Sequence, residues 1–160
     1  MTEPVFDIAH LGHVEILTDR FEESLDFFTR VYGLTGTARS GESAYLRAFD
    51  DYEHHSLQLT RSQTTGVGHI AYRTSSAAAL DRRVAAIEAA GFGLGWTDPG
   101  LGHGPAYRFR SPFGHVFEVY WETERYNPPA AERPALKNIA QRFHGRGCCP
   151  RRIDHVNLLA

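Results

Sequence analysis

The chain has 160 residues, 42% of them hydrophobic and 22% charged, a balance that suits one globular domain or two small halves sharing a core. Its formal net charge of −2 argues against a protein that binds nucleic acid by neutralising phosphates. No apolar run is long enough to span a bilayer, and the first ten residues lack a signal-peptide pattern. We therefore expect no membrane contact and a cytoplasmic protein, with Cys148 and Cys149 as free thiols.

The first half of the chain reads as a strand, a helix and three further strands. A short apolar alternation at 13–18 predicts the first strand. Apolar residues then recur at helical spacing from Phe21 to Val31, which predicts a helix near 20–32. Three strand-like segments complete this unit by about residue 62.

The same order of elements then starts again. The segment 69–74 predicts a strand, and the alanine-rich stretch after it predicts a helix near 76–90 with Ser75 or Ser76 as its N-cap. Three more strand-like segments end near residue 122. The sequence thus predicts an α+β fold made of paired βαβββ units.

The two units align residue by residue, which indicates an internal duplication. The separations are nearly constant for four matches: His13 with His69, Tyr45 with Tyr107, His55 with His115, and Gln58 with Glu118. We place the repeats at about 8–62 and 66–122. They are expected to form one curved, incomplete barrel with both helices on the outside.

Strand alternation brings three potential metal ligands to the inner face of this barrel. His13, His69 and Glu118 each lie on the side of a strand opposite to its apolar packing face. If the two units curl one sheet around a common cavity, the three side chains point into it together. Two histidines and one carboxylate form the ligand set of a facial triad, which typically holds a divalent metal such as Fe(II).

Other residues leave a metal-free reading open. Histidines on half-buried strands are commonly hydrogen-bonded residues without a metal, and Gln58, the fourth symmetric position, is a weak neutral ligand. Glu15 and Arg73 are predicted on the same inner faces, where they could pair with each other and where Arg73 would repel a cation. His103, in a glycine-rich segment, could cover a pocket but reads rather as part of a plain turn, and 53–55 reads as a solvated loop.

After residue 122 the composition of the sequence changes. The segment 123–152 is rich in proline and reads as a linker with at most a short helix near 132–141. Residues 153–160 then begin like a third copy of the first strand, with His155 in the place of His13 or His69. We expect the chain from about residue 150 to pack poorly, and its unpaired strand edge predicts a homo-oligomer.

Residues 8–160 resemble the N-terminal module of a two-module extradiol ring-cleaving dioxygenase. The resemblance is carried by HLGHVEILT, SLDFFTRVYGL, HHSLQLT and GVGHIAYRT, and most specifically by SPFGHVFEVYWETERY followed by RPALKN and RRIDHVNLLA. The family is that of catechol 2,3-dioxygenase and dihydroxybiphenyl dioxygenase, within the vicinal oxygen chelate superfamily. It includes enzymes of aromatic hydrocarbon catabolism.

The resemblance implies that different parts of the chain belong to different modules. Residues 8–122 would form one module, and 153–160 would be the first strand of a second module whose remainder lies beyond this chain. His155 would be the first metal ligand of the working site, with no catalytic or cofactor-binding residue in the rest of the chain. The implied cofactor is Fe(II), the implied partners are a small aromatic diol and O₂, and the chain alone would be inactive.

Two alternatives remain at this point. The first module of such enzymes usually lacks a metal, whereas this chain has a candidate ligand at all three equivalent positions. It could therefore be a small glyoxalase-like metalloenzyme that uses its own site with Mn(II), Ni(II) or Zn(II). It could also be a non-enzymatic module that binds an aromatic compound or a drug.

Overall fold

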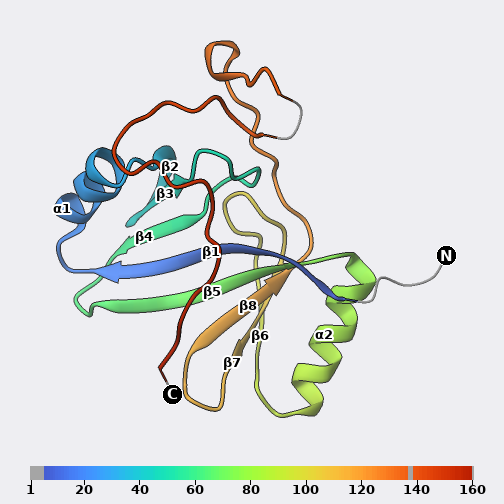
Figure 1. Cartoon of the computed structure of the whole chain (residues 1–160). Coiled ribbons are helices and arrows are strands. Elements are labelled where there is room, and N and C mark those ends of the chain that lie inside the picture. Colours follow the sequence, from blue (N-terminus) through green and yellow to red (C-terminus); the bar gives the residue numbers. More distant parts are fainter. Residues whose placement is uncertain (1–5, 137–138, 160) are drawn as a thin grey trace.

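The computed structural model describes residues 6–136 and 139–159 (Figure 1). Both predicted βαβββ units are present, and both helices form where the periodicity places them. The first unit consists of β1 (Ile8–Thr18), α1 (Phe21–Asp26) continued by the π-helical turn η1 (Phe27–Val31), β2 (Thr35–Ser40), β3 (Ser43–Arg47) and β4 (Leu57–Arg61). The second unit consists of β5 (Gly66–Thr74), α2 (Ala77–Ala89), β6 (Gly93–Thr97), β7 (Ala106–Arg110) and β8 (Val116–Tyr120).

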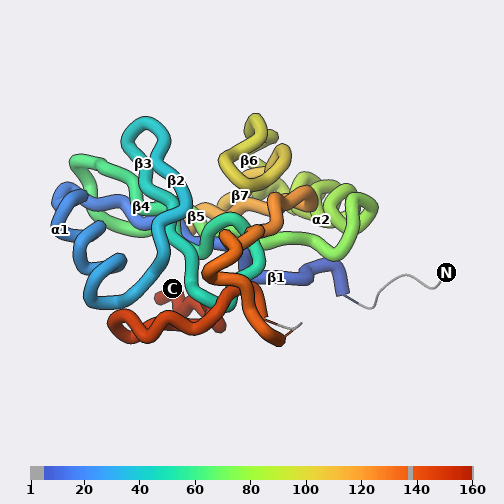
Figure 2. Tube along the Cα trace, turned by 90° about the horizontal axis from the view of Figure 1, so that it is seen from above, coloured from blue at the N-terminus to red at the C-terminus, as the bar shows by residue number. Residues whose placement is uncertain are grey.

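All eight strands belong to one open sheet with the order β2-β3-β4-β1-β5-β8-β7-β6. β1 and β5 pair antiparallel in the middle, β1 pairs parallel with β4, and β5 pairs parallel with β8. The two halves therefore repeat one arrangement on either side of the β1–β5 seam. Both flanks of the sheet rise on the same side of this seam (Figure 2), which confirms the curved, incomplete barrel of the α+β prediction.

Apolar residues on the outer face of the sheet hold the two helices in place. Each helix buries one apolar stripe against the strands of its own half, which is what an amphipathic helix on a half-buried sheet requires. The α1 cluster comprises Phe21, Leu25, Leu34, Ala44, Leu46, Ala48, Leu57 and Leu59. The α2 cluster comprises Leu80, Val84, Tyr107 and Val119. Polar side chains are thereby left to the inner face.

The strand register corrects one of the predicted matches between the halves. Tyr45 lies opposite Gln58 on the neighbouring strand, whereas Glu118 lies opposite Arg108 rather than Tyr107. Tyr45 therefore corresponds to Arg108, and its match with Tyr107 is wrong by one residue. Because side chains alternate along a strand, this single step moves Tyr107 to the outer face, where it packs with the residues of α2.

The segment after β8 is irregular where it is described. It contains one 3₁₀ turn, η2 (Ala130–Glu132), in place of the predicted helix near 132–141, of which 137–138 lie outside the described residues. The segment nevertheless docks firmly through Gln141, which is buried and hydrogen-bonded to the buried Arg47 guanidinium.

The chain then crosses the first half of the molecule on the outer side of β1 (Figure 1). The Phe49 amide donates to the Pro150 carbonyl at 3.2 Å, and the Asp50 amide donates to the Arg151 carbonyl at 3.1 Å. The Asp50 carboxylate is fully buried and accepts from the Arg151 guanidinium at 2.6 Å. The expectation of poor packing from about residue 150 is therefore wrong for 150–152.

Residues 153–159 adopt no regular strand in the described part of the chain, and among them Ile153, Val156 and Leu158 are half-buried while the others are exposed. Their assignment as the first strand of a second module stays a prediction. Of the helices in the described ranges, none has the length and apolar character needed to cross a membrane.

Candidate metal centre

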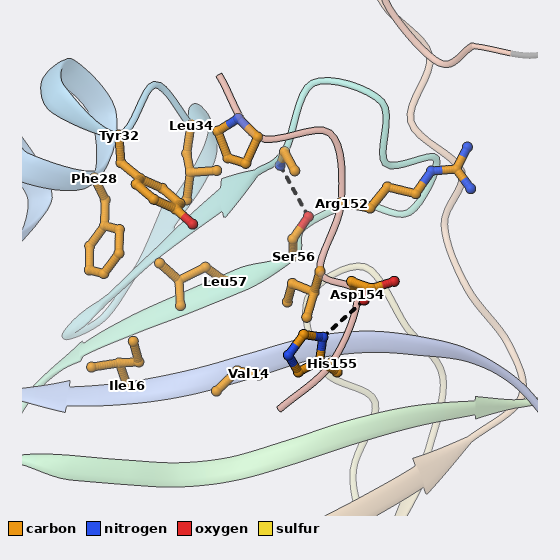
Figure 3. Close-up of a pocket in the computed structure, with 13 residues that line it drawn as sticks. Val14, Ile16, Phe28, Tyr32, Leu34, Ser56, Leu57, Arg152, Asp154 and His155 are labelled. Carbon is orange, nitrogen blue, oxygen red and sulfur yellow. Dashed lines mark hydrogen bonds and ion pairs between the residues drawn. The ribbon is translucent and has the colours of Figure 1, made fainter. Parts of the chain in front are cut away.

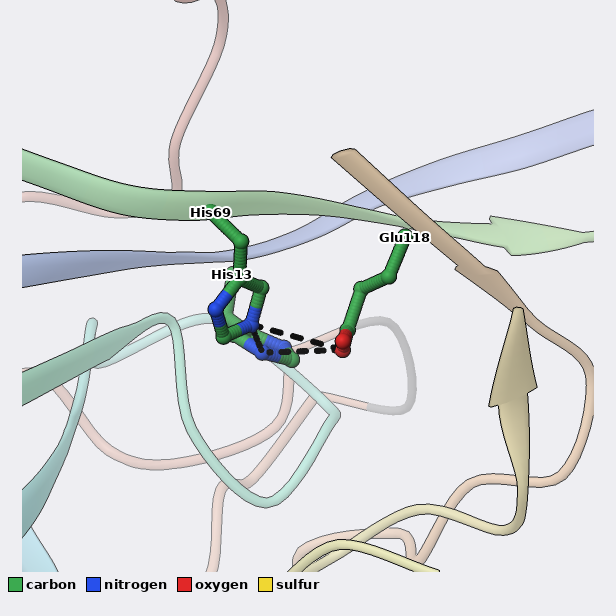
Figure 4. Close-up of side chains that lie close together, drawn as sticks. All are labelled: His13, His69 and Glu118. Carbon is green, nitrogen blue, oxygen red and sulfur yellow. Dashed lines mark hydrogen bonds and ion pairs between the residues drawn. The ribbon is translucent and has the colours of Figure 1, made fainter. Parts of the chain in front are cut away.

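Three neighbouring strands each place one potential ligand on the inner face of the sheet (Figure 4). β1 carries His13, β5 carries His69 and β8 carries Glu118. The antiparallel seam brings the two histidines together, and the parallel β5–β8 register sets Glu118 opposite Ala71, two residues from His69. All three side chains are buried. The residues that the sequence singles out thus converge at one point, while metal binding itself stays a prediction.

The spacing of the three facing atoms suits a metal ion. The Nε2 atoms of His13 and His69 are 3.0 Å apart. Glu118 Oε1 lies 3.6 Å from the first and 3.4 Å from the second. These separations leave a point about 2 Å from each of the three atoms, and metal bonds to imidazole nitrogen and carboxylate oxygen are roughly 2.0–2.2 Å long.

The two oxygens of Glu118 have different surroundings. Oε2 accepts a hydrogen bond from Arg108 Nε at 3.1 Å. Oε1 is buried and has no hydrogen-bond donor. Buried carboxylate oxygens rarely lack a partner, so an unpartnered oxygen that faces two imidazole nitrogens is a position that a cation would satisfy.

Glu15 provides an outer partner for one of the histidines. Its Oε2 accepts from His69 Nδ1 at 2.8 Å, while its Oε1 accepts from Gln58 at 2.9 Å and from Thr60 at 2.7 Å. A carboxylate on Nδ1 fixes the imidazole ring and directs Nε2 toward the centre, as in many metal sites. Gln58, considered above as a ligand, instead holds this carboxylate.

Arg73 does not enter the space between the histidines. Its Nε donates to Glu53 at 2.6 Å, and its terminal nitrogen donates to the Tyr52 hydroxyl at 2.6 Å. The expected pairing of Glu15 with Arg73 is therefore wrong, because each side chain has a different partner. The repulsion that Arg73 was expected to exert on a cation is offset by the Glu53 carboxylate bound to it.

Burial and the two carboxylates together determine the charge at the centre. Burial lowers the pKa of His13 well below its usual value. Burial also opposes a charge on His69, but the interactions of its ring with the Glu118 and Glu15 carboxylates outweigh burial and raise the pKa of His69 to about 9. Burial would raise the pKa of Glu118, yet its interactions with His69 lower that pKa to about 2. The Glu15 and Glu118 carboxylates therefore stabilise a positive charge at this centre, which His69 carries in the metal-free chain.

Two further histidines border the centre where the sequence predicted only loops. His55 is buried, and its ring centre lies 4.3 Å from that of His13. His103 has Nδ1 2.8 Å from the Gly104 carbonyl, and its Nε2 lies 3.7 Å from Glu118 Oε1. The reading of 53–55 as a solvated loop is therefore wrong. His103 does close a turn, which bridges back to Gly100, and its ring also borders the centre.

The glycines that precede both strand histidines have a steric role. A Cβ at Gly68 would overlap the Glu15 carboxylate, and a Cβ at Gly12 would overlap the Tyr120 hydroxyl. Each glycine lets a polar group of a neighbouring strand approach the backbone beside its histidine. The repeated Gly-His pair was the signal in the sequence for these close approaches.

His155 lies on the other face of the sheet. It borders a cavity of about 400 Å³ on the side where Val14 and Ile16 point (Figure 3). Its side chain is 80% exposed, and its Nδ1 is 2.9 Å from Asp154 Oδ2. The structure thus brings His13, His69 and Glu118 together and keeps His155 apart from them.

Comparison with known proteins places this geometry in a family. The sequence profile of the Glyoxalase/Bleomycin resistance protein/Dioxygenase superfamily matches residues 10–119. The metapyrocatechase of Geobacillus stearothermophilus is 45% identical over 98% of this chain and 48% of its own length. A manganese-dependent 2,3-dihydroxybiphenyl 1,2-dioxygenase of Geobacillus genomosp. 3 is 39% identical over 95% of this chain and 49% of its own. The chain thus spans about half the length of these curated relatives.

Solved structures show the same likeness. Homoprotocatechuate 2,3-dioxygenase of Arthrobacter globiformis superposes with a TM-score of 0.72 at 29% identity, covering 78% of this chain and 39% of that enzyme. An extradiol ring-cleaving dioxygenase of Brevibacterium fuscum superposes with a TM-score of 0.71 at 26% identity, covering 79% of this chain and 37% of the other.

Proposed function

Because the chain belongs to the Glyoxalase/Bleomycin resistance protein/Dioxygenase superfamily, we propose that it is the N-terminal module of an extradiol dioxygenase that cleaves catechol-type diols with O₂. The observation that carries this proposal is the likeness along nearly the whole chain to half of a metapyrocatechase. On this proposal the remaining part of the working site comes from the portion of the relatives' length that this chain does not span.

We assign His155 to that working site as its first metal ligand. Its pairing with Asp154 through Nδ1 supports this role, because it leaves Nε2 available to a metal. The ion would bind the diol and O₂ on one face and stabilise developing negative charge. Fe(II) is the proposed ion. Mn(II) is the other candidate, since one relative is named as manganese-dependent.

Apart from His155, the described residues would contribute position rather than chemistry to this reaction. Arg151 and Arg152 both reach the buried Asp50 carboxylate, at 2.6 and 3.4 Å. These contacts hold the backbone three residues before His155 against the first half of the module. The module would thereby fix where the following strand begins.

The assembly and location of the protein are further parts of this proposal. The open sheet ends in β2 on one side and β6 on the other, and unpaired strand edges favour contact with a second copy, which supports a homo-oligomer. Cys148 is exposed and Cys149 is buried, and neither forms a disulfide. Free thiols support a reducing compartment such as the cytoplasm.

The inner triad favours a second candidate function. Its convergence, with one carboxylate oxygen left unpartnered, is what a glyoxalase-like metalloenzyme working with Mn(II), Ni(II) or Zn(II) within this chain would need. This candidate requires activity in the 160-residue chain alone, which is tested with Mn(II), Ni(II) or Zn(II) and a hemithioacetal in place of Fe(II) and catechol.

The test compares the chain alone with a chimera in which it replaces the matching half of the Geobacillus stearothermophilus metapyrocatechase. Oxygen uptake and the absorbance of the ring-opened product are followed with catechol and Fe(II). We expect turnover by the chimera, none by the 160-residue chain, and loss of turnover in the chimera with His155→Ala. A folded chimera without activity would overturn the proposal. Activity of the short chain that His69→Ala abolishes would favour the second candidate.

A further inference from the structure

We propose that the chain binds a divalent transition-metal ion on its own inner face through His13 Nε2, His69 Nε2 and Glu118 Oε1. This site is separate from the one assigned to His155, which lies on the opposite face of the sheet. The inference does not rest on the dioxygenase proposal, since it concerns residues that are all present in this chain.

The three ligand atoms already lie close together in the folded chain. The three atoms lie 3.0, 3.4 and 3.6 Å from one another. Three strands of the sheet hold them, and strands position side chains more rigidly than loops do. An ion about 2 Å from all three requires little movement of any side chain.

No cationic side chain of the described residues takes the place of the ion. Arg73, the cation expected to compete, is paired with Glu53. Arg108 binds only the outer oxygen of Glu118, which leaves Oε1 buried and without a donor. A buried carboxylate oxygen in this state is costly unless a cation or a donor reaches it.

Neighbouring polar side chains fix the orientation of the ligands. The contact of His69 Nδ1 with Glu15 directs the other ring nitrogen to the centre. Gln58 and Thr60 both donate to Glu15, so this outer carboxylate is itself held in place. Arg108 does the same for Glu118. Such outer contacts are typical of built metal sites, in which they orient the ligands.

The donor set indicates the class of ion. Two imidazoles and one carboxylate suit Fe(II), Mn(II), Co(II) or Zn(II), whereas Mg²⁺ and Ca²⁺ prefer an all-oxygen shell. His103 Nε2, 3.7 Å from Glu118 Oε1, stands beside the three ligands as a potential fourth donor. The three protein ligands leave the remaining coordination positions to His103 or to water.

The test is metal binding by the 160-residue chain, read without any activity assay. The chelator-treated protein is titrated with Co(II), and bound metal is measured by equilibrium dialysis and by the visible absorption of coordinated Co(II). We expect one ion per chain and a higher melting temperature in its presence. Glu118→Gln and His13→Gln should each weaken binding by about 100-fold or more, because loss of an outer contact alone costs roughly 10- to 100-fold.

His144→Ala is the matched control, since His144 contacts Arg146 and Cys149 in the C-terminal segment and none of the three ligands, and this variant should leave binding unchanged. Circular dichroism of the metal-free variants checks that they are folded. If the variants do not fold, paramagnetic broadening by Mn(II) in the unmodified chain must begin in the NMR signals around His13, His69 and Glu118. No bound ion in the unmodified chain, binding that survives both ligand variants, or broadening centred on His155 would each overturn the proposal.

Discussion

The two halves of the molecule share a backbone plan but use equivalent positions differently. Each half supplies one histidine beside the seam, His13 in the first and His69 in the second. The strand parallel to it carries Gln58 in the first half and Glu118 in the second. The first half therefore provides an amide where the second provides a carboxylate.

A second difference compensates for the first. Glu15, on the strand of His13, binds the histidine of the other half, whereas the equivalent residue of the second half is Ala71. The centre is thus built across the seam, with its ligands and outer contacts divided between the two copies. After duplication, one complete site can be formed from two incomplete ones.

The largest expected difference between the halves concerns a pair of equivalent arginines. Arg47 is fully buried, donates to the carbonyls of Ala48, Phe49 and Asp51, and lies 3.4 Å above the Tyr126 ring. Arg47→Ala leaves these acceptors unpaired and opens a cavity. We expect it to lower the free energy of unfolding by about 2–4 kcal/mol in urea denaturation.

Arg110 is the matched control, because it occupies the same strand position in the second half but is exposed. It donates to the Gly114 carbonyl at 2.7 Å within its own hairpin. Arg110→Ala should change the free energy of unfolding by no more than about 0.5 kcal/mol. Equal losses of unfolding free energy in Arg47→Ala and Arg110→Ala would contradict the view that the C-terminal segment covers only the first half.

The next largest effect is expected at Glu15, a residue of the first half that contacts His69, the histidine ligand of the second half. Glu15→Gln keeps the shape of the side chain but weakens its hold on His69 Nδ1. We expect affinity for Co(II) to fall by about 10- to 100-fold, and the metal-free chain to melt at a lower temperature because the buried His69 loses a carboxylate partner.

Glu22→Gln provides the comparison for this charge change, since Glu22 is exposed and pairs with Arg61 on the surface. It should leave Co(II) affinity unaltered. Unchanged affinity in Glu15→Gln as well would show that the two halves contribute to the centre independently.

The smallest effect is expected where the C-terminal segment meets the first half. Arg151 binds the buried Asp50 carboxylate, but its own side chain is 69% exposed, and Arg152 remains as a second partner. Arg151→Ala should therefore lower the free energy of unfolding by about 1 kcal/mol or less. Repeating the urea denaturation in high salt should shrink the difference, and a loss that is independent of salt would contradict a role through charge.

Much of the fold could be predicted from the sequence because its determinants are local. The alternation around His13 and His69 and the helical spacing from Phe21 locate the elements and the inner face. The duplication then predicts that the three ligands point toward one another, as they do. The Tyr45 match failed because unequal loops between the halves hide the true register.

The features that the sequence did not reveal depend on contacts between residues far apart in the chain. Alternation assigns Glu15 and Arg73 to the inner face, but it cannot tell which group each will meet there. His55 and His103 lie in segments with the composition of loops, and only the packing of neighbouring strands buries them. The docking of 150–152 was missed because Asp50, its buried acceptor, resembles any turn aspartate in the sequence.

That docking also bears on the order in which the protein can mature during synthesis. Asp50 and Arg151 are 101 positions apart, so the first half is translated long before its closing segment exists. At a translation rate of about 5–20 residues per second, the interval is roughly 5 to 20 s. During this time the Asp50 carboxylate and the Arg47 guanidinium lack the C-terminal groups they bind in the finished protein. The part of the chain that is made first is therefore among the last to reach its final state.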